Sequence, residues 1–266
     1  MPDQSAGNGL NLQQALERLD EPTVLYRQGE HAVYWLGVPE DTSFRSNIYL
    51  ILDGDHGLLV DPGSRHLFDQ VYRRVTQIMP PQSLAGMILC HQDPDVAASM
   101  GQWLAVNPAM KVLTTPRTQV LLPHYDPPPY DYYDVEANPE YLLPSGRSLR
   151  FIPAPFLHFP GAFTTYDAGA RLLFSGDIWA AIDLNWQLVV DSFVDHIPAM
   201  DLFHTEYMAS NLAARGFVQR LHDLPINAIL PQHGSIIGPA MVPDALEYLL
   251  NLRCGTDIIY AGLSDR

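Results

Sequence analysis

The chain has 266 residues, of which 47% are hydrophobic and 17% are charged, a composition typical of a soluble globular protein that buries a full core. Its formal net charge of −15 argues against nucleic acid or an anionic membrane as the main partner, because both are negatively charged. No apolar run approaches the roughly 18 residues of a transmembrane helix. The N-terminus lacks the basic and apolar stretches of a secretory signal. Two cysteines, Cys90 and Cys254, form no disulfide framework, which is compatible with the reducing cytoplasm.

The first half of the chain alternates short apolar runs with polar turns, a pattern that predicts mostly strands. Strands are expected over residues 24–27, 31–38, 47–52, 58–60, 87–90 and 112–115. Helices are expected over residues 67–79 and 96–106, where apolar side chains recur on one helical face.

A different segment follows at residues 123–144, which hold six prolines and five tyrosines. This composition predicts a long surface loop. Such a loop is either an irregular excursion without a role, or a lid or dimer contact over a functional site.

The second half returns to short apolar runs. Strands are expected over residues 149–154, 162–166, 172–174 and 228–230, and helices over 198–221 and 243–252. No repeat and no Gly/Ser linker divides the chain. Two groups of strands with interspersed helices predict two sheets faced by helices, an α/β fold of the αββα sandwich type, formed by residues 1–266 as a single domain.

Candidate metal ligands gather directly after the expected strand 87–90. The segment His91-Gln-Asp93-Pro-Asp95 places one imidazole and two carboxylates at alternate positions. A chain that turns at the end of a strand can direct such side chains toward one point. Cys90, just before them, is expected to point away by strand alternation and to pack in the core.

Three further candidates, His158, Asp177 and His233, each follow or end an apolar run. Each is weak evidence alone, because a lone histidine beside Phe and Pro is more often a core or surface residue. Together with the first segment they give six ligands, which suit two metal ions about 3.5–4 Å apart sharing one carboxylate. The turn at Asp61 receives no ligand role, and most remaining histidines are expected at the surface: His31, His56, His66, His124, His196, His204 and His222.

These segments resemble the metallo-β-lactamase superfamily. The resemblance covers nearly the whole chain, from the strand at residues 47–51 and the turn at 61–63 to the terminal Gln-His-Gly at 232–234. Hydrolases of that superfamily carry His-x-His-x-Asp-His, whereas this chain has Asp93 and Val96 where the second and last histidines would stand. An acidic residue at the middle position, usually Glu, is the mark of the flavodiiron branch. The chain is therefore similar to a flavodiiron core, or oxygen-binding diiron protein, without a flavodoxin domain.

The resemblance implies a role for each candidate. His91, Asp93 and His158 would hold one iron, Asp95 and His233 the other, and Asp177 would bridge the two. Val96 cannot coordinate, so the second iron would have one protein ligand fewer. Independently of the family, three carboxylates mixed with histidines suit non-haem iron that moves between Fe(II) and Fe(III).

Tyr207 resembles a tyrosine that the family carries near its diiron pocket. It would then hydrogen-bond a bound dioxygen species, although an ordinary half-buried helix tyrosine explains it equally well.

Three functions are compatible with these features. The first is a redox enzyme that reduces O2 or NO with an external electron donor, since the sequence has no flavin motif. The second is a binding module that takes up O2 and signals to a partner, which the missing flavodoxin domain favours slightly. The third is a dizinc hydrolase, against which Asp93 and Val96 count. The resemblance further implies a homodimer.

Overall fold

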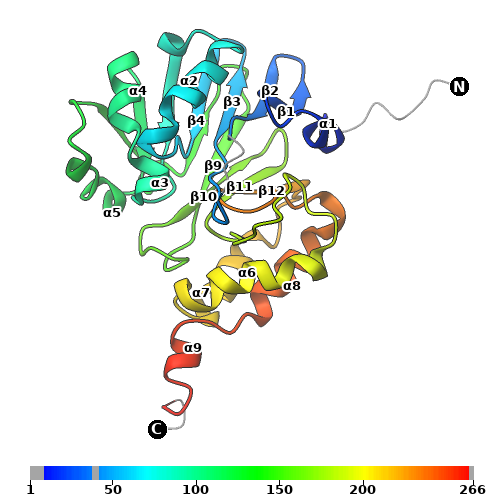
Figure 1. Cartoon of the computed structure of the whole chain (residues 1–266). Coiled ribbons are helices and arrows are strands. Elements are labelled where there is room, and N and C mark those ends of the chain that lie inside the picture. Colours follow the sequence, from blue (N-terminus) through cyan, green and yellow to red (C-terminus); the bar gives the residue numbers. More distant parts are fainter. Residues whose placement is uncertain (1–8, 38–41, 264–266) are drawn as a thin grey trace, which may run out of the picture.

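Two β-sheets packed face to face form the centre of the protein, and helices cover both outer faces (Figure 1). The computed structural model describes residues 9–37 and 42–263. The predicted αββα sandwich is confirmed. Val38, the last residue of the strand expected over 31–38, lies outside the described residues.

The first sheet has seven strands in chain order. They are β1 (Thr23–Gln28), β2 (His31–Trp35), β3 (Tyr49–Asp53), β4 (His56–Val60), β5 (Leu84–Ile88), β6 (Lys111–Thr114) and β7 (Asp131–Asp134). β1 to β4 pair antiparallel, whereas β4 to β7 pair parallel. The parallel pairing brings the carboxyl ends of β4 and β5 to the same edge.

The second sheet has five strands in the order β12-β11-β10-β9-β8. They are β8 (Glu140–Leu142), β9 (Ser148–Pro153), β10 (Phe163–Asp167), β11 (Leu172–Gly176) and β12 (Ala228–Pro231). β11 and β12 are parallel, and the rest pair antiparallel. The carboxyl ends of β11 and β12 therefore also lie at one edge.

The main helices belong to two groups, with short helices at the start and end of the chain. The helices are α1 (Leu12–Glu17), α2 (Phe68–Thr76), α3 (Pro94–Ala97), α4 (Met100–Val106), α5 (Pro116–Gln119), α6 (Phe193–Tyr207), α7 (Asn211–Leu221), α8 (Val242–Asn251) and α9 (Thr256–Ile259). α2 and α4 cover the first sheet, and α6 to α8 cover the second (Figure 1).

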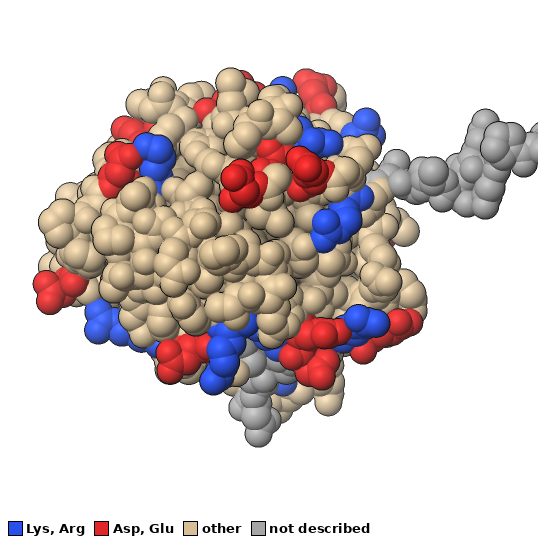
Figure 2. All heavy atoms as spheres, turned by 90° about the horizontal axis from the view of Figure 1, so that it is seen from above, with Lys and Arg blue, Asp and Glu red and all other residues tan. Residues whose placement is uncertain are grey.

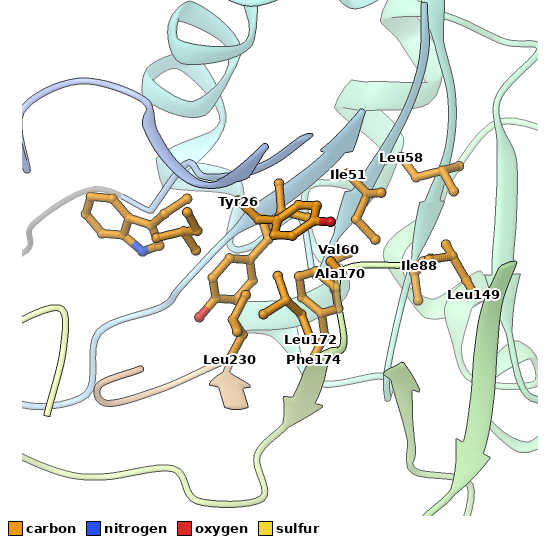
Figure 3. Packing of buried hydrophobic residues seen from close by; sticks show 14 of the residues in the cluster. Tyr26, Ile51, Leu58, Val60, Ile88, Leu149, Ala170, Leu172, Phe174 and Leu230 are labelled. Carbon is orange, nitrogen blue, oxygen red and sulfur yellow. The ribbon is translucent and has the colours of Figure 1, made fainter. Parts of the chain in front are cut away.

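Strand alternation divides the apolar side chains among three layers. In β4, Leu58 and Val60 face the space between the sheets, where they share a core with Leu172 and Phe174 of β11 (Figure 3). Leu59, between the two, faces outward and packs in the layer that includes α2 and α4. The central strands of both sheets are thus buried on both faces, which explains why they are near-continuous apolar runs.

Three sequence expectations are corrected by the structure. Residues 123–144 are not an uninterrupted loop: they contain β7, at the edge of the first sheet, and β8, at the edge of the second. The side chains of both strands are exposed or half-buried, which explains why neither is an apolar run. The helix expected over 96–106 is divided into α3 and α4, and the one over 198–221 into α6 and α7, where Ser210 accepts a hydrogen bond from the Ala213 N–H and caps α7.

Among the described helices, none is long and apolar enough to cross a membrane. One face of the molecule carries acidic and basic side chains around a broad uncharged area (Figure 2).

A buried charge cluster ties the two sheets together at His31 of β2. Its Nε2 lies 2.7 Å from Asp167 Oδ2 on β10, and its Nδ1 lies 3.3 Å from Asp53 Oδ1 on β3. All three side chains are almost fully buried. Of the histidines expected mostly at the surface, His66, His124 and His222 are exposed and His56 is half-buried, whereas His31, His196 and His204 are buried.

Replacing His31 by leucine should destabilise the fold strongly. Two buried carboxylates would lose the group between them, and breaking a buried pair in this way costs about 3–5 kcal/mol. Urea unfolding at neutral pH measures the effect, with His222→Leu as the control, because His222 is exposed beside Asp223. A His31→Leu variant as stable as the control would contradict this role.

The same cluster predicts a loss of stability in acid. Burial alone would raise the pKa of Asp53, but hydrogen bonds from Ser145 and the nearby His31 outweigh burial and lower it below the usual value. A carboxyl whose pKa is lowered on folding stabilises the fold when ionised, so this contribution is lost as the pH falls below about 4. Urea unfolding across that range should show a smaller acid dependence for Asp53→Asn than for the unaltered protein.

Candidate metal centre

The six candidate ligands converge at one edge of the sandwich. His91 follows β5, Asp93 caps α3 and Asp95 lies in its first turn. His158 lies in the loop between β9 and β10, whereas Asp177 and His233 directly follow β11 and β12. Short loops from both sheets therefore present side chains to one space, as the strand ends predicted.

The first group contains His91, Asp93, His158 and Asp177, whose ligand atoms all lie within 4.8 Å of one another. His158 Nε2 is 2.8 Å from Asp177 Oδ2 and 3.3 Å from Asp93 Oδ2. His91 Nε2 is 3.2 Å from Asp177 Oδ2 and 3.5 Å from Asp93 Oδ2. Two imidazoles and two carboxylates thus surround one point.

The second group shares Asp177 with the first. His233 Nε2 lies 2.9 Å from Asp95 Oδ2 and 3.8 Å from Asp177 Oδ1. The two oxygens of Asp177 therefore face different groups, Oδ2 the first and Oδ1 the second. Val96, at the position of the hydrolases' last histidine, is fully buried in the outer core and points to no ligand group.

The residues fit a pair of metal ions. Asp177 Oδ1 is buried and has no hydrogen-bond partner, a costly arrangement unless another group satisfies it. Burial alone would raise the pKa of Asp177, but His91 and the hydrogen bonds from His158 and His91 hold it well below its usual range. Burial would lower the pKa of His158, yet its hydrogen bonds to Asp177 and Asp93 raise it to about 9. The Asp177 carboxylate thus remains ionised, and its negative charge favours the binding of a cation beside it.

The other ring nitrogen of His91 faces Cys90 rather than solvent. Cys90 Sγ lies 2.9 Å from His91 Nδ1, the ring nitrogen opposite the Nε2 that faces the carboxylates. The cysteine is buried in the outer core, as expected. The backbone N–H of Cys90 donates to Asp61 Oδ1 over 2.9 Å, and burial raises the pKa of Asp61 to about 6. Asp61 therefore holds the backbone just before His91, and it is not among the proposed ligands.

The loop that carries His233 is held by buried side chains of the first sheet. Asn47 Nδ2 donates to the carbonyls of Pro231 and Gly234, at 3.0 and 2.9 Å, and its Oδ1 accepts from Trp35 Nε1 at 2.9 Å. His233 Nδ1 lies 2.9 Å from the carbonyl oxygen of Arg45, which orients the ring.

A histidine of α6 holds the segment after Asp177. His204 Nε2 accepts from the Trp179 N–H at 2.9 Å, and its Nδ1 lies 2.9 Å from the Met200 carbonyl. Burial lowers the pKa of His204 to about 4, which keeps this ring neutral. Its partner Trp179 has a φ of 65°, so the hydrogen bond fixes an unfavourable backbone conformation two residues from the ligand.

Aromatic side chains pack in a row beside the candidate ligands. Phe44 stacks on His233 with ring centroids 3.6 Å apart, Phe203 lies 5.4 Å from Phe44, and Tyr207 stacks on Phe203 at 4.6 Å. Tyr207 is also 6.1 Å from His158 between ring centroids, and it is 55% exposed. The tyrosine singled out by resemblance therefore lies at the rim of the centre.

Sequence reasoning missed the supporting residues Phe44, Asn47, Phe203 and His204. Asn47 and His204 are distant in sequence from the loops they hold, and neither has a local pattern that indicates a partner. Asn47 stands in the segment that carries the family resemblance, which was the available indication.

Fold and centre together define the class of protein: a metallo-β-lactamase-type sandwich with a His/carboxylate cluster at its edge. Residues 44–234 match the family described as ODP family beta lactamase, and the chain belongs to this family. The predicted resemblance is confirmed. A solved structure described as the peroxy diiron species of chemotaxis sensor ODP is 32% identical, covers 91% of this chain and 99% of that one, and has a TM-score of 0.79. The apo state of chemotaxis sensor ODP from T. denticola gives 32% identity and a TM-score of 0.76.

Curated relatives are larger proteins. The nitric oxide reductase of Moorella thermoacetica is 28% identical over 224 residues, which are 77% of this chain and 55% of that protein. Diflavin flavoprotein A 1 of Synechocystis is 31% identical over 144 residues, or 54% of this chain and 24% of that protein. The chain spans about half or less of the length of these relatives.

Proposed function

We propose that this chain is a non-haem diiron protein that binds O2 or NO between two iron ions. His91, Asp93 and His158 would hold one iron, Asp95 and His233 the other, with Asp177 as the bridge. One observation carries the proposal: the two oxygens of the Asp177 carboxylate face different ligand groups, Oδ2 the first and Oδ1 the second.

The protein's own residues would set the chemistry of this pair. When bound, the irons supply the electrons that O2 or NO accepts. Asp177, Asp93 and Asp95 offset their positive charge, and the partners of His91 and His233 fix the orientation of these two rings. Phe44 and Phe203 restrict the access of water to the ligands, since hydrophobic surroundings control solvent access at metal sites. Tyr207 at the rim is the nearby hydroxyl that would hydrogen-bond the captured gas.

Oxygen sensing is the favoured use, with reduction by an external donor as its rival. A sensor is supported by the 32% identical chemotaxis sensor ODP, which the chain covers almost completely. The two uses differ in turnover. We expect slow consumption of O2 and NO with an artificial donor and a persistent oxygenated form, whereas rapid catalytic consumption of either gas would favour the reductase.

The dizinc hydrolase is the alternative that metal analysis tests. Protein purified from cells grown with both metals should contain iron, because three carboxylates among six ligands favour it. Zinc without iron would overturn the diiron proposal.

Asp93→Ala should remove the ion of the first group. Asp93 lies 3.3 Å from His158 Nε2 and 3.5 Å from His91 Nε2, so its loss leaves that ion with two histidines and the shared Asp177. We expect iron content to fall by about half, measured by elemental analysis, with exposed Asp191→Asn as a control. An alanine variant that retains both irons would show that Asp93 is not a required ligand.

We propose that the protein is a cytoplasmic homodimer in which residues 1–266 form one diiron domain, served by an external electron donor or a signalling partner. The two buried cysteines, which form no disulfide, support the cytoplasm. Light scattering of the purified chain tests the dimer.

A further inference from the structure

A cavity lies beside the metal centre, and none of the proposed metal ligands lines it. It has a volume of about 410 Å³, within the range of roughly 300–1,000 Å³ of small-molecule sites. Its walls come from β9, from the start of β10, from the segment at residues 155–162 and from the link between β7 and β8.

The interior of this cavity is apolar. Phe151 and Phe163 are buried and pack edge to face with centroids 5.7 Å apart, and Phe156 contributes a third ring that is 51% exposed. Prolines and Val135 complete most of the lining. Three aromatic rings in a cavity of this size suit a flat apolar group.

Phe156 is held in place by the backbone. Its φ is 68°, a left-handed conformation that is unfavourable for a bulky residue. Its N–H donates to the Phe159 carbonyl at 2.9 Å, and its carbonyl accepts from the Ala209 N–H at 3.2 Å. The ring is therefore presented at the cavity by a fixed loop, two residues before His158.

Two charged side chains of opposite sign also line the cavity. Arg117 is exposed, and its stem packs so closely on Gly161 that a side chain there would meet Arg117 Cβ at 2.6 Å. Glu136 is exposed on the link between β7 and β8, where its N–H donates to Asp134. Within residues 9–37 and 42–263, neither charged group has a hydrogen bond or ion pair from its side chain. A ligand with one anion and one cation could therefore pair with both.

We propose that this cavity binds a small zwitterion with an aromatic body, of which a free aromatic amino acid is the simplest case. The carboxylate pairs with Arg117, the ammonium with Glu136, and the ring lies among Phe151, Phe156 and Phe163. Because Pro155, Phe156 and Pro160 flank His158 in the same loop, an occupied cavity would also hold the loop that carries a proposed metal ligand.

Calorimetry on metal-free protein tests this site with L-phenylalanine, 3-phenylpropionate and phenethylamine as probes. L-phenylalanine should bind more tightly than either truncated probe. Arg117→Gln should weaken the binding of L-phenylalanine and 3-phenylpropionate by about tenfold or more and leave that of phenethylamine unchanged, because only the first two lose a charge-assisted hydrogen bond. Glu136→Gln should weaken the binding of L-phenylalanine and phenethylamine, which carry an ammonium group, and leave that of 3-phenylpropionate unchanged.

The matched controls are Arg73→Gln and Glu17→Gln, two exposed charges outside this cavity. They should bind all three probes as the unaltered protein does. No binding of L-phenylalanine, or equal binding by the cavity variants and the controls, would overturn the proposal. Tighter binding of a truncated probe than of L-phenylalanine would overturn its zwitterionic character. The test needs no metal, so its failure leaves the diiron proposal standing.

Discussion

Asp177→Asn is expected to abolish the paired metal site. The substitution keeps the shape of the side chain but removes the negative charge that both ligand groups share through Oδ1 and Oδ2. Each ion would lose an anionic ligand, and the repulsion between them would no longer be offset. Elemental analysis after reconstitution should find fewer than one ion per chain instead of two.

Asp223→Asn is the matched control, because its carboxylate is 95% exposed and pairs only with exposed His222. It should bind as much metal as the unaltered protein. An Asp177→Asn variant that still holds two ions would show that Asp177 is not the bridge, and circular dichroism on the metal-free variant would establish that the fold is intact.

Asn47→Leu should both weaken the fold and loosen the His233 loop. The amide makes three buried hydrogen bonds, with Trp35, Pro231 and Gly234. Leucine of similar size would leave the buried Trp35 Nε1–H without an acceptor, at about 1–3 kcal/mol, whereas the Pro231 and Gly234 carbonyls keep hydrogen bonds from Tyr49 and Trp186. We expect a loss of about 2 kcal/mol in urea unfolding, together with weaker binding of the ion near His233.

Asn251→Leu makes the same chemical change at an exposed position on α8, where the amide bonds only to Glu247 of its own helix. Its stability should change by no more than about 0.5 kcal/mol. If Asn47→Leu destabilises no more than this control, the loop of His233 does not depend on Asn47.

Much of the fold and the location of the centre could be predicted, because both depend on local patterns. Buried strands are short apolar runs, and polar residues directly after them mark the edge where loops meet. His91, Asp177 and His233 each follow such a run. The structure brings them together with Asp93, Asp95 and His158, which is what the strand-end argument required.

The parts that could not be predicted depend on partners distant in sequence. His31 is separated by 136 residues from Asp167, and nothing beside His31 in the chain indicates that carboxylate. The edge strands β7 and β8 lack an alternating apolar pattern because their side chains are exposed or half-buried. His204 is a similar case. Its Nε2 accepts a hydrogen bond from the backbone N–H of Trp179, which lies in a different segment of the chain.

The optical spectrum of the iron-loaded protein tests the diiron centre most directly. Anaerobically reduced protein with two irons per chain is exposed to air, and iron content is measured on the same sample. We predict a visible absorption band that develops on exposure, is lost in Asp177→Asn and is retained in Asp223→Asn. Protein that contains zinc alone and develops no visible band would contradict the diiron function of this chain.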